Sequence, residues 1–128
     1  MVEILTRVIL LEKVNLHIKL ISNDNVLDEK TIGTINNDSD ELIYFEKSTT
    51  KVKFNYQKNT LIRENNDLRL EFAFKKNSTT TGIINIKELQ KNLEVDIKTI
   101  DIKQTKNSLE IKYLLEAEEY LYVISMEE

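Results

Sequence analysis

The stretch KVKFNYQKNTLIRENNDLRLEFAF, residues 51–74, decides the fold of this chain. Apolar residues take every second position in two parts of it: Val52, Phe54 and Tyr56, then Leu68, Leu70, Phe72 and Phe74. Charged side chains fill most of the positions between them. Because alternation at period two buries only one side of a strand, both parts need an opposing apolar surface. The stretch therefore predicts two strands of a closed barrel or of two stacked sheets.

Further strands are predicted over residues 14–21, 29–35, 42–47, 60–64, 83–86, 93–102, 109–115 and 120–125. Alternation is clearest over residues 14–21, whereas residues 42–47 are apolar on both faces, which predicts a central or covered strand. Gly33 lies inside the strand predicted over residues 29–35 and indicates a bulge or a close approach of two backbones. After Thr99 the apolar positions change parity, which is what a bulge or a barrel corner produces inside a continuous strand. Residues 2–11 fit a short helix as well as an additional strand.

The turns depend on asparagine and aspartate, because proline is absent and glycine occurs twice. Both residues tolerate left-handed backbone angles and bond to their own backbone. Short turns between nine or ten strands favour an antiparallel up-and-down order, and closure removes the exposed edges of such a sheet. We predict an all-β protein with a single antiparallel barrel domain of about 8–10 strands over residues 1–128, in preference to a sandwich. Residues 1–12 are a candidate N-terminal extension of it.

Composition and charge narrow the class of protein. The chain has no cysteine and one histidine, His17, so it offers no disulfide, no thiolate and no imidazole pair for a metal. The formal charge of −4 gives no global attraction to nucleic acid or to an anionic membrane. The longest apolar run, residues 8–11, is far shorter than the roughly 20 residues of a membrane helix and does not resemble a signal peptide. We predict a cytoplasmic protein with no nucleic-acid or membrane partner.

Several short motifs resemble the YwiB-like family of small bacterial β-barrel proteins. The motifs are Leu42-Ile-Tyr-Phe-Glu46, Thr50, Val52, Leu61-Ile-Arg63, Thr79-Thr-Thr-Gly82 and Leu109-Glu-Ile-Lys-Tyr113-Leu. The resemblance covers roughly residues 13–126 and implies a calycin-like barrel, of the lipocalin and streptavidin type, with no assigned function. The family pattern has a Thr-x-x-Gly turn that often contains proline and an aromatic residue, where this chain has Thr80 and Thr81.

Arg63 is the first candidate for a binding residue. If Leu61 faces inward, Arg63 does so too, two positions further along the same strand. A guanidinium group at a barrel mouth would hold an anionic ligand or stack on an aromatic ring. It would also serve to close the barrel end by bonding to backbone carbonyl groups. If Ile62 faces inward instead, Arg63 is solvated.

Three tyrosines are further candidates, since Tyr44, Tyr56 and Tyr113 all take apolar-face positions. Their hydroxyl groups would line a cavity, because a barrel of this size either holds one small ligand or is filled by its own side chains. His17 points away from the apolar face of its strand, and Glu94 and Asp96 share a face with Lys98. Those polar residues indicate solvated surfaces.

These observations lead to two hypotheses of function. The first is a non-enzymatic barrel that binds a small hydrophobic, amphipathic or anionic ligand at a mouth including Arg63, Tyr44, Tyr56 and Tyr113. The second is a protein-interaction or accessory domain that acts through an outer face or an edge strand, as a homodimer for example. The sequence offers no nucleophile with a base, no metal spacing and no phosphate loop, so we expect no enzyme, no metal and no cofactor.

Overall fold

The computed structural model of the protein describes residues 11–127, which form ten β-strands. The strands are β1 (Leu11–Ile21), β2 (Val26–Asn36), β3 (Glu41–Glu46), β4 (Thr50–Asn55), β5 (Thr60–Glu64), β6 (Leu68–Ala73), β7 (Ser78–Ile86), β8 (Lys91–Gln104), β9 (Ser108–Leu115) and β10 (Glu118–Glu127). All pairs are antiparallel, and the sheet closes in the order β1-β10-β9-β8-β7-β6-β5-β4-β3-β2. The predicted up-and-down barrel is confirmed. Within residues 11–127 no helix is long and apolar enough to cross a membrane.

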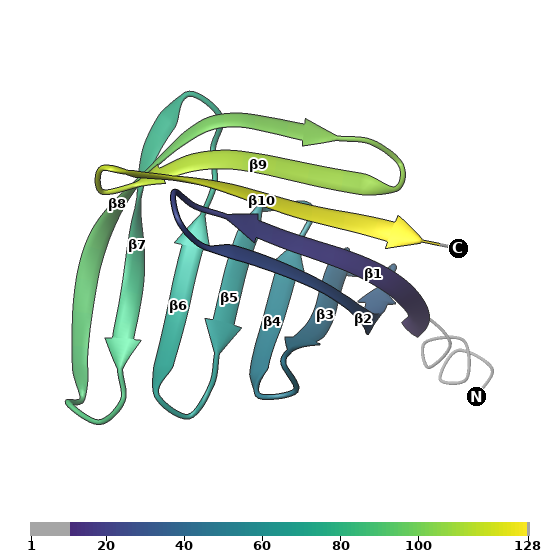
Figure 1. Cartoon of the computed structure of the whole chain (residues 1–128), viewed down its shortest axis with the longest axis horizontal. Coiled ribbons are helices and arrows are strands. Elements are labelled where there is room, and N and C mark those ends of the chain that lie inside the picture. Colours follow the sequence, from purple (N-terminus) through teal and green to yellow (C-terminus); the bar gives the residue numbers. More distant parts are fainter. Residues whose placement is uncertain (1–10, 128) are drawn as a thin grey trace.

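The barrel is flattened into two layers of strands that cross at a steep angle (Figure 1). The layer of β9, β10, β1 and β2 lies in front of the layer of β3 to β7, and the long strand β8 belongs to both. The first half of β8 pairs with β7 and its second half pairs with β9, with a register shift between Thr99 and Asp101. This shift is the bulge that the parity change predicted, and it lies where the strand turns from one layer into the other.

The core forms from the inward sides of both layers. Of the predicted apolar faces of residues 52–74, Val52 and Phe54 are fully buried and Phe72 and Phe74 nearly so, whereas Leu68 is 38% exposed. Leu16 and Ile18 of β1 and Ile124 of β10 oppose them from the front layer. Lys51 is exposed and Lys53 is half-buried on the outer side, so the lysines of β4 and its aromatic rings lie on opposite faces.

Asparagine side chains organise three of the turns. Asn36, Asn55 and Asn65 each accept two backbone N–H groups of the following turn through the side-chain oxygen. Left-handed backbone angles are not restricted to asparagine and aspartate, as the sequence had suggested. They occur at Asp40, Asn59 and Asn77, but also at Lys47, Ser48, Gln90 and Glu116. Turn geometry at those four positions is therefore imposed by strand pairing and not by the residue type.

Two boundaries differ from the predicted ones. The Thr79–Gly82 segment, expected as a turn, lies inside β7, where Thr81 pairs with Asp96 and Gly82 with Val95. β1 begins at Leu11, so Leu11 and Glu12 belong to the barrel and not to an extension. The other residues that fit either a helix or a strand, 2–10, lie outside the described part of the chain.

Gly33 allows a close approach of β2 to its neighbours. It pairs directly with Val14 in a regular register, so the alternative of a bulge is not realised. A Cβ atom at Gly33 would lie 2.7 Å from Leu16 Cδ1 and 2.8 Å from the carbonyl oxygen of Ile43. The carbonyl belongs to the backbone of β3 and has little room to move.

We therefore expect Gly33→Ala to lower the free energy of unfolding by about 1–3 kcal/mol, the usual cost of overpacking. Urea denaturation followed by circular dichroism measures the change. Gly82→Ala is the comparison variant for a clash with side chains alone, because its added Cβ would lie 2.6 Å from Ile97 Cδ1 and 2.7 Å from Phe72 Cδ1; we expect it to be destabilised as well, by less to the extent that these side chains can shift. A Gly33→Ala protein as stable as the wild type would contradict the close contact with β3.

Candidate functional site

Arg63 and Glu46 form an ion pair inside the barrel. Arg63 Nε lies 3.0 Å from Glu46 Oε1, and the second guanidinium nitrogen lies 3.0 Å from Oε2, so both ends of the planar fork are bonded. Only 15% of the Arg63 side chain and 10% of the Glu46 side chain are exposed. Burial alone would lower the pKa of Arg63, but the charge of Glu46 raises the pKa above its ordinary value. The inward orientation is confirmed, with a carboxylate as the partner instead of backbone carbonyls.

Two buried phenols lie beside this ion pair. The hydroxyl groups of Tyr44 in β3 and Tyr122 in β10 are hydrogen-bonded to each other, which joins the two layers of the barrel. Burial raises the pKa of Tyr44 and of Tyr122, and the charge of Glu46 raises the pKa of Tyr44 further. Both phenols therefore stay neutral and act as a structural bridge across the core.

Tyr113 also lies inside the barrel, but it packs instead of bonding. Its ring centroid is 4.9 Å from that of Phe74 and 5.3 Å from that of Tyr120, on which it stacks within 10° of parallel. Burial raises the pKa of Tyr113 to about 12. The stack fills the corner region near Thr99, its direct neighbour in β8.

Tyr56 is separated from the other three candidates. It follows β4 at the barrel end formed by the β2–β3, β4–β5 and β8–β9 turns, whereas Arg63 lies toward the opposite end of β5. Its ring packs edge-on against Phe54 at 5.1 Å, and burial raises the pKa of Tyr56 to about 12. The structure therefore brings Arg63 and Tyr44 together and places Tyr56 in a different environment.

A groove of about 510 Å³ opens at the end where Tyr56 lies, and we call it the Tyr56 mouth. Its floor is made by half-buried apolar residues that pack on the core, namely Val14, Ile35, Tyr56 and Met126. Its rim carries Glu12, Asp40, Lys106 and the polar residues of the β8–β9 turn. The arrangement is apolar at the bottom and polar at the edge.

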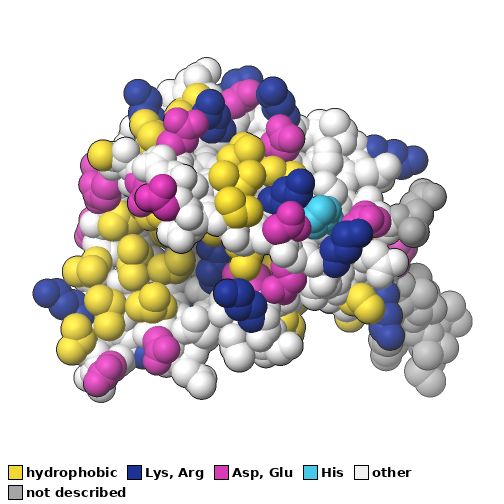
Figure 2. All heavy atoms as spheres, viewed as in Figure 1, with side chains coloured by type: hydrophobic (Ala, Val, Ile, Leu, Met, Phe, Trp, Pro, Cys, Tyr) yellow, Lys and Arg dark blue, Asp and Glu magenta, His cyan; other side chains and the backbone are white. Residues whose placement is uncertain are grey.

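The opposite end of the back layer has an uncovered apolar surface. Hydrophobic side chains gather over the lower ends of β7 and β8, where the front layer does not reach (Figure 2). Inward-facing residues of three strands form this open inner face: Leu68, Leu70, Ile84, Ile86, Leu93 and Val95. It borders the ion pair, because Leu70 lies directly opposite Arg63.

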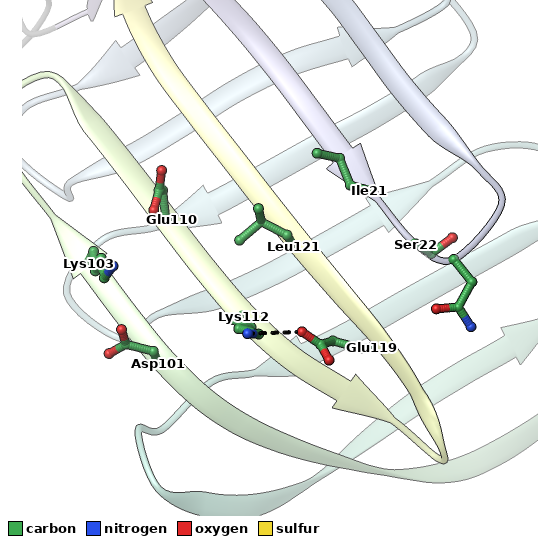
Figure 3. A pocket seen from close by; sticks show the side chains of 9 residues that line it. Ile21, Ser22, Asp101, Lys103, Glu110, Lys112, Glu119 and Leu121 are labelled. Atoms are coloured by element: carbon green, nitrogen blue, oxygen red, sulfur yellow. Dashed lines mark ion pairs between the residues drawn. The ribbon is translucent and has the colours of Figure 1, made fainter.

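A third candidate is a groove of about 600 Å³ on the outer side of β8, β9, β10 and the end of β1. Charged side chains dominate its lining, and they oppose one another in sign (Figure 3). Lys112 Nζ lies 3.1 Å from Glu119 Oε1, and Lys103 lies directly across from Glu110. Since these charges compensate one another, the groove offers little charge to a ligand.

Sequence reasoning missed two residues of the interior, Glu46 and Tyr122. Both had a readable signal, because Glu46 shares the inward parity of Leu42 and Tyr44, and Tyr122 that of Ile124. A carboxylate at an inward position predicts a buried cation as its partner. The expected surface residues are confirmed: Glu94 and Asp96 are exposed, and His17 bonds to Asp28 on the outer side.

Comparison with known proteins places the chain in a family. Residues 13–125 match the family model described as Domain of unknown function (DUF1934). The chain belongs to this family. The crystal structure of the ywiB protein from Bacillus subtilis superposes on this chain with a TM-score of 0.71 and 17% sequence identity, over 91% of this chain and 92% of that one. The DUF1934 match and this structural match confirm the resemblance and the calycin-like fold. No curated protein matches the chain in sequence.

Proposed function

We propose that this DUF1934 protein is a non-enzymatic binding protein that holds a small amphipathic molecule in the Tyr56 mouth. The supporting observation is the groove itself. Its volume of about 510 Å³ lies in the range of about 300–1,000 Å³ that small-molecule sites occupy, and barrel mouths are a usual place for such sites. The larger outer groove has two apolar lining residues, Ile21 and Leu121, among mostly charged side chains.

The chemistry of the lining indicates the class of ligand. Val14, Ile35 and Met126 would contact an apolar body, and the phenol of Tyr56 would donate a hydrogen bond, since its pKa of about 12 keeps it protonated. Glu12 and Asp40 outnumber Lys106 at the rim, which disfavours an anion. The anionic ligand expected from the sequence depended on Arg63, whose fork is bonded to Glu46 at the other end of the barrel. We therefore propose a neutral or cationic amphipathic ligand.

The proposal predicts binding of Nile red, a neutral amphipathic dye, with a loss of affinity in Met126→Glu. A buried methionine contributes about 1.5–3 kcal/mol of apolar transfer free energy, so the dissociation constant should rise roughly tenfold or more. Fluorescence titration measures this. Leu93→Glu is the control, because it changes the open inner face and leaves the Tyr56 mouth intact.

If Leu93→Glu removes dye binding and Met126→Glu does not, the dye binds to the open inner face and the proposed site is wrong. Native mass spectrometry of protein purified from its own host complements the titration. It would report a bound small molecule that Met126→Glu no longer retains.

A further inference from the structure

β8 has a free edge next to the open inner face. Along residues 91–99 it pairs with β7 on one side, but on the other side β9 begins to pair only at Ile97. The last backbone bond on that side runs from the N–H of Glu116 to the carbonyl of Asp96, at 3.3 Å. Within residues 11–127 no strand lies beside residues 91–95. Their backbone groups are therefore free to pair with another strand.

Two of the features that usually prevent strand pairing are missing from this edge, because residues 91–95 contain neither proline nor a bulge. The inward side of the edge carries Leu93, 37% exposed, and Val95, with Lys91 at its end. By contrast, the incomplete seam between β2 and β3 is closed by side chains, because Glu29 accepts the N–H of Lys47 and Thr31 donates to the carbonyl of Phe45.

We propose that the free edge of β8 pairs with β8 of a second copy of this chain, about a two-fold axis at Leu93. This inference is independent of the proposed ligand site, which lies at the other end of the barrel. In a two-fold antiparallel pair the axis is perpendicular to the sheet, so the apolar faces of both copies lie on the same side. β7 and β8 of each copy would then form one continuous sheet.

The charges along β8 select this register. An axis at Glu94 would place two glutamates directly opposite each other, which is destabilising. An axis at Asn92 would draw Gln90, a turn residue with a positive φ of 49°, into the ladder. An axis at Leu93 pairs residues 91–95 with the same residues of the second copy. That is the whole length left free between the β7–β8 turn and Glu116.

The register also covers exposed apolar side chains. Leu93 meets its own copy, and Val95 lies under the aliphatic part of Lys91 from the second chain. Leu89, 64% exposed in the β7–β8 turn, would come next to the β9–β10 turn of the second copy, because that turn begins where the free edge ends. The dimer thus covers two exposed apolar residues, Leu93 and Leu89, and the half-buried Val95 with one contact.

Disulfide trapping tests the register, because the chain has no cysteine. Directly opposite Cα atoms are about 4.5–5.5 Å apart, within the range of a disulfide, so Leu93→Cys should form covalent dimers under mild oxidation. Glu94→Cys is the matched control. In this register the Cα atoms of residue 94 in the two copies are diagonal neighbours, about 7–8 Å apart, which is beyond the reach of a disulfide. This variant should therefore form covalent dimers only at the level of chance collisions.

Equal trapping in both variants, or none in either, would overturn the proposal. Sedimentation equilibrium of the unmodified chain is the second measurement. As the protein concentration rises, the average molar mass of the wild type should approach that of two chains. The Leu93→Lys variant, which places like charges at the axis, should keep the mass of a single chain. A wild-type mass of one chain at every concentration also overturns the dimer, and would leave the edge available to an extended segment of a different protein.

Discussion

Replacing Glu46 by leucine is expected to lower the free energy of unfolding by about 3–5 kcal/mol, the usual cost of removing one partner of a buried ion pair. The substitution leaves the guanidinium group of Arg63 charged and largely buried, with no carboxylate to bond. An arginine does not escape this cost by losing its proton, because its pKa is already too high. Guanidinium chloride denaturation measures the change in stability.

A double variant separates the ion pair from the general packing of the site. Glu46→Leu combined with Arg63→Met removes both charges and keeps apolar volume, and replacements of this kind are often neutral or stabilising. We expect the double variant to recover most of the stability that Glu46→Leu loses. If both variants are equally unstable, the loss arises from packing around Tyr44 and not from the unpaired charge.

The strands of the barrel were predictable because each depends on local alternation. Residues 68–74 show their inward face within one segment, and the bulge near Thr99 shows itself as a change of parity inside one strand. The start of β7 was not predictable in this way. Its first five residues, Ser78 to Gly82, include no large apolar side chain, so the strand is held by backbone pairing with β8 instead.

The interior site was predictable only in part, because it depends on register between strands. Parity correctly predicted that Arg63 faces inward once Leu61 does. Its partner Glu46 lies 17 residues away and is brought to it through β4, which pairs with both β3 and β5. The separation of Tyr56 from Tyr44 likewise follows from their positions along the strands. Alternation shows which face a side chain takes, but not which end of the barrel it lies at.

The open inner face could not be predicted from the sequence, for a different reason. Leu70, Ile84 and Leu93 carry the same apolar pattern as fully buried residues, and alternation alone predicts that they are covered. Whether a second layer covers them depends on where β8 bends and how far the front layer extends, which are properties of the whole barrel (Figure 1).

Raising the pH above about 10 is expected to destabilise the barrel steeply, since phenols titrate near 10 in an unfolded chain. Burial raises the pKa of Tyr56 and of Tyr113 to about 12, and that of Tyr44 and Tyr122 as well. Between these values the unfolded chain has released phenolic protons that the native chain still holds, so stability falls as pH rises. Each such phenol lowers the free energy of unfolding by about 1.4 kcal/mol per pH unit. By pH 12 this amounts to about 3 kcal/mol for Tyr56 and about the same for Tyr113.

Phenolate absorbance and circular dichroism, recorded together against pH, test this expectation. The buried phenols should ionise only as the β-sheet signal is lost, because ionisation requires exposure to water. Tyr113→Phe should make the fall in stability shallower by about 1.4 kcal/mol per pH unit, whereas Tyr120→Phe, at a more exposed position, should change it far less. Ionisation of all five tyrosines near pH 10 with the sheet intact would show that the phenols are open to solvent. The bond between Tyr44 and Tyr122 would then not join the two layers.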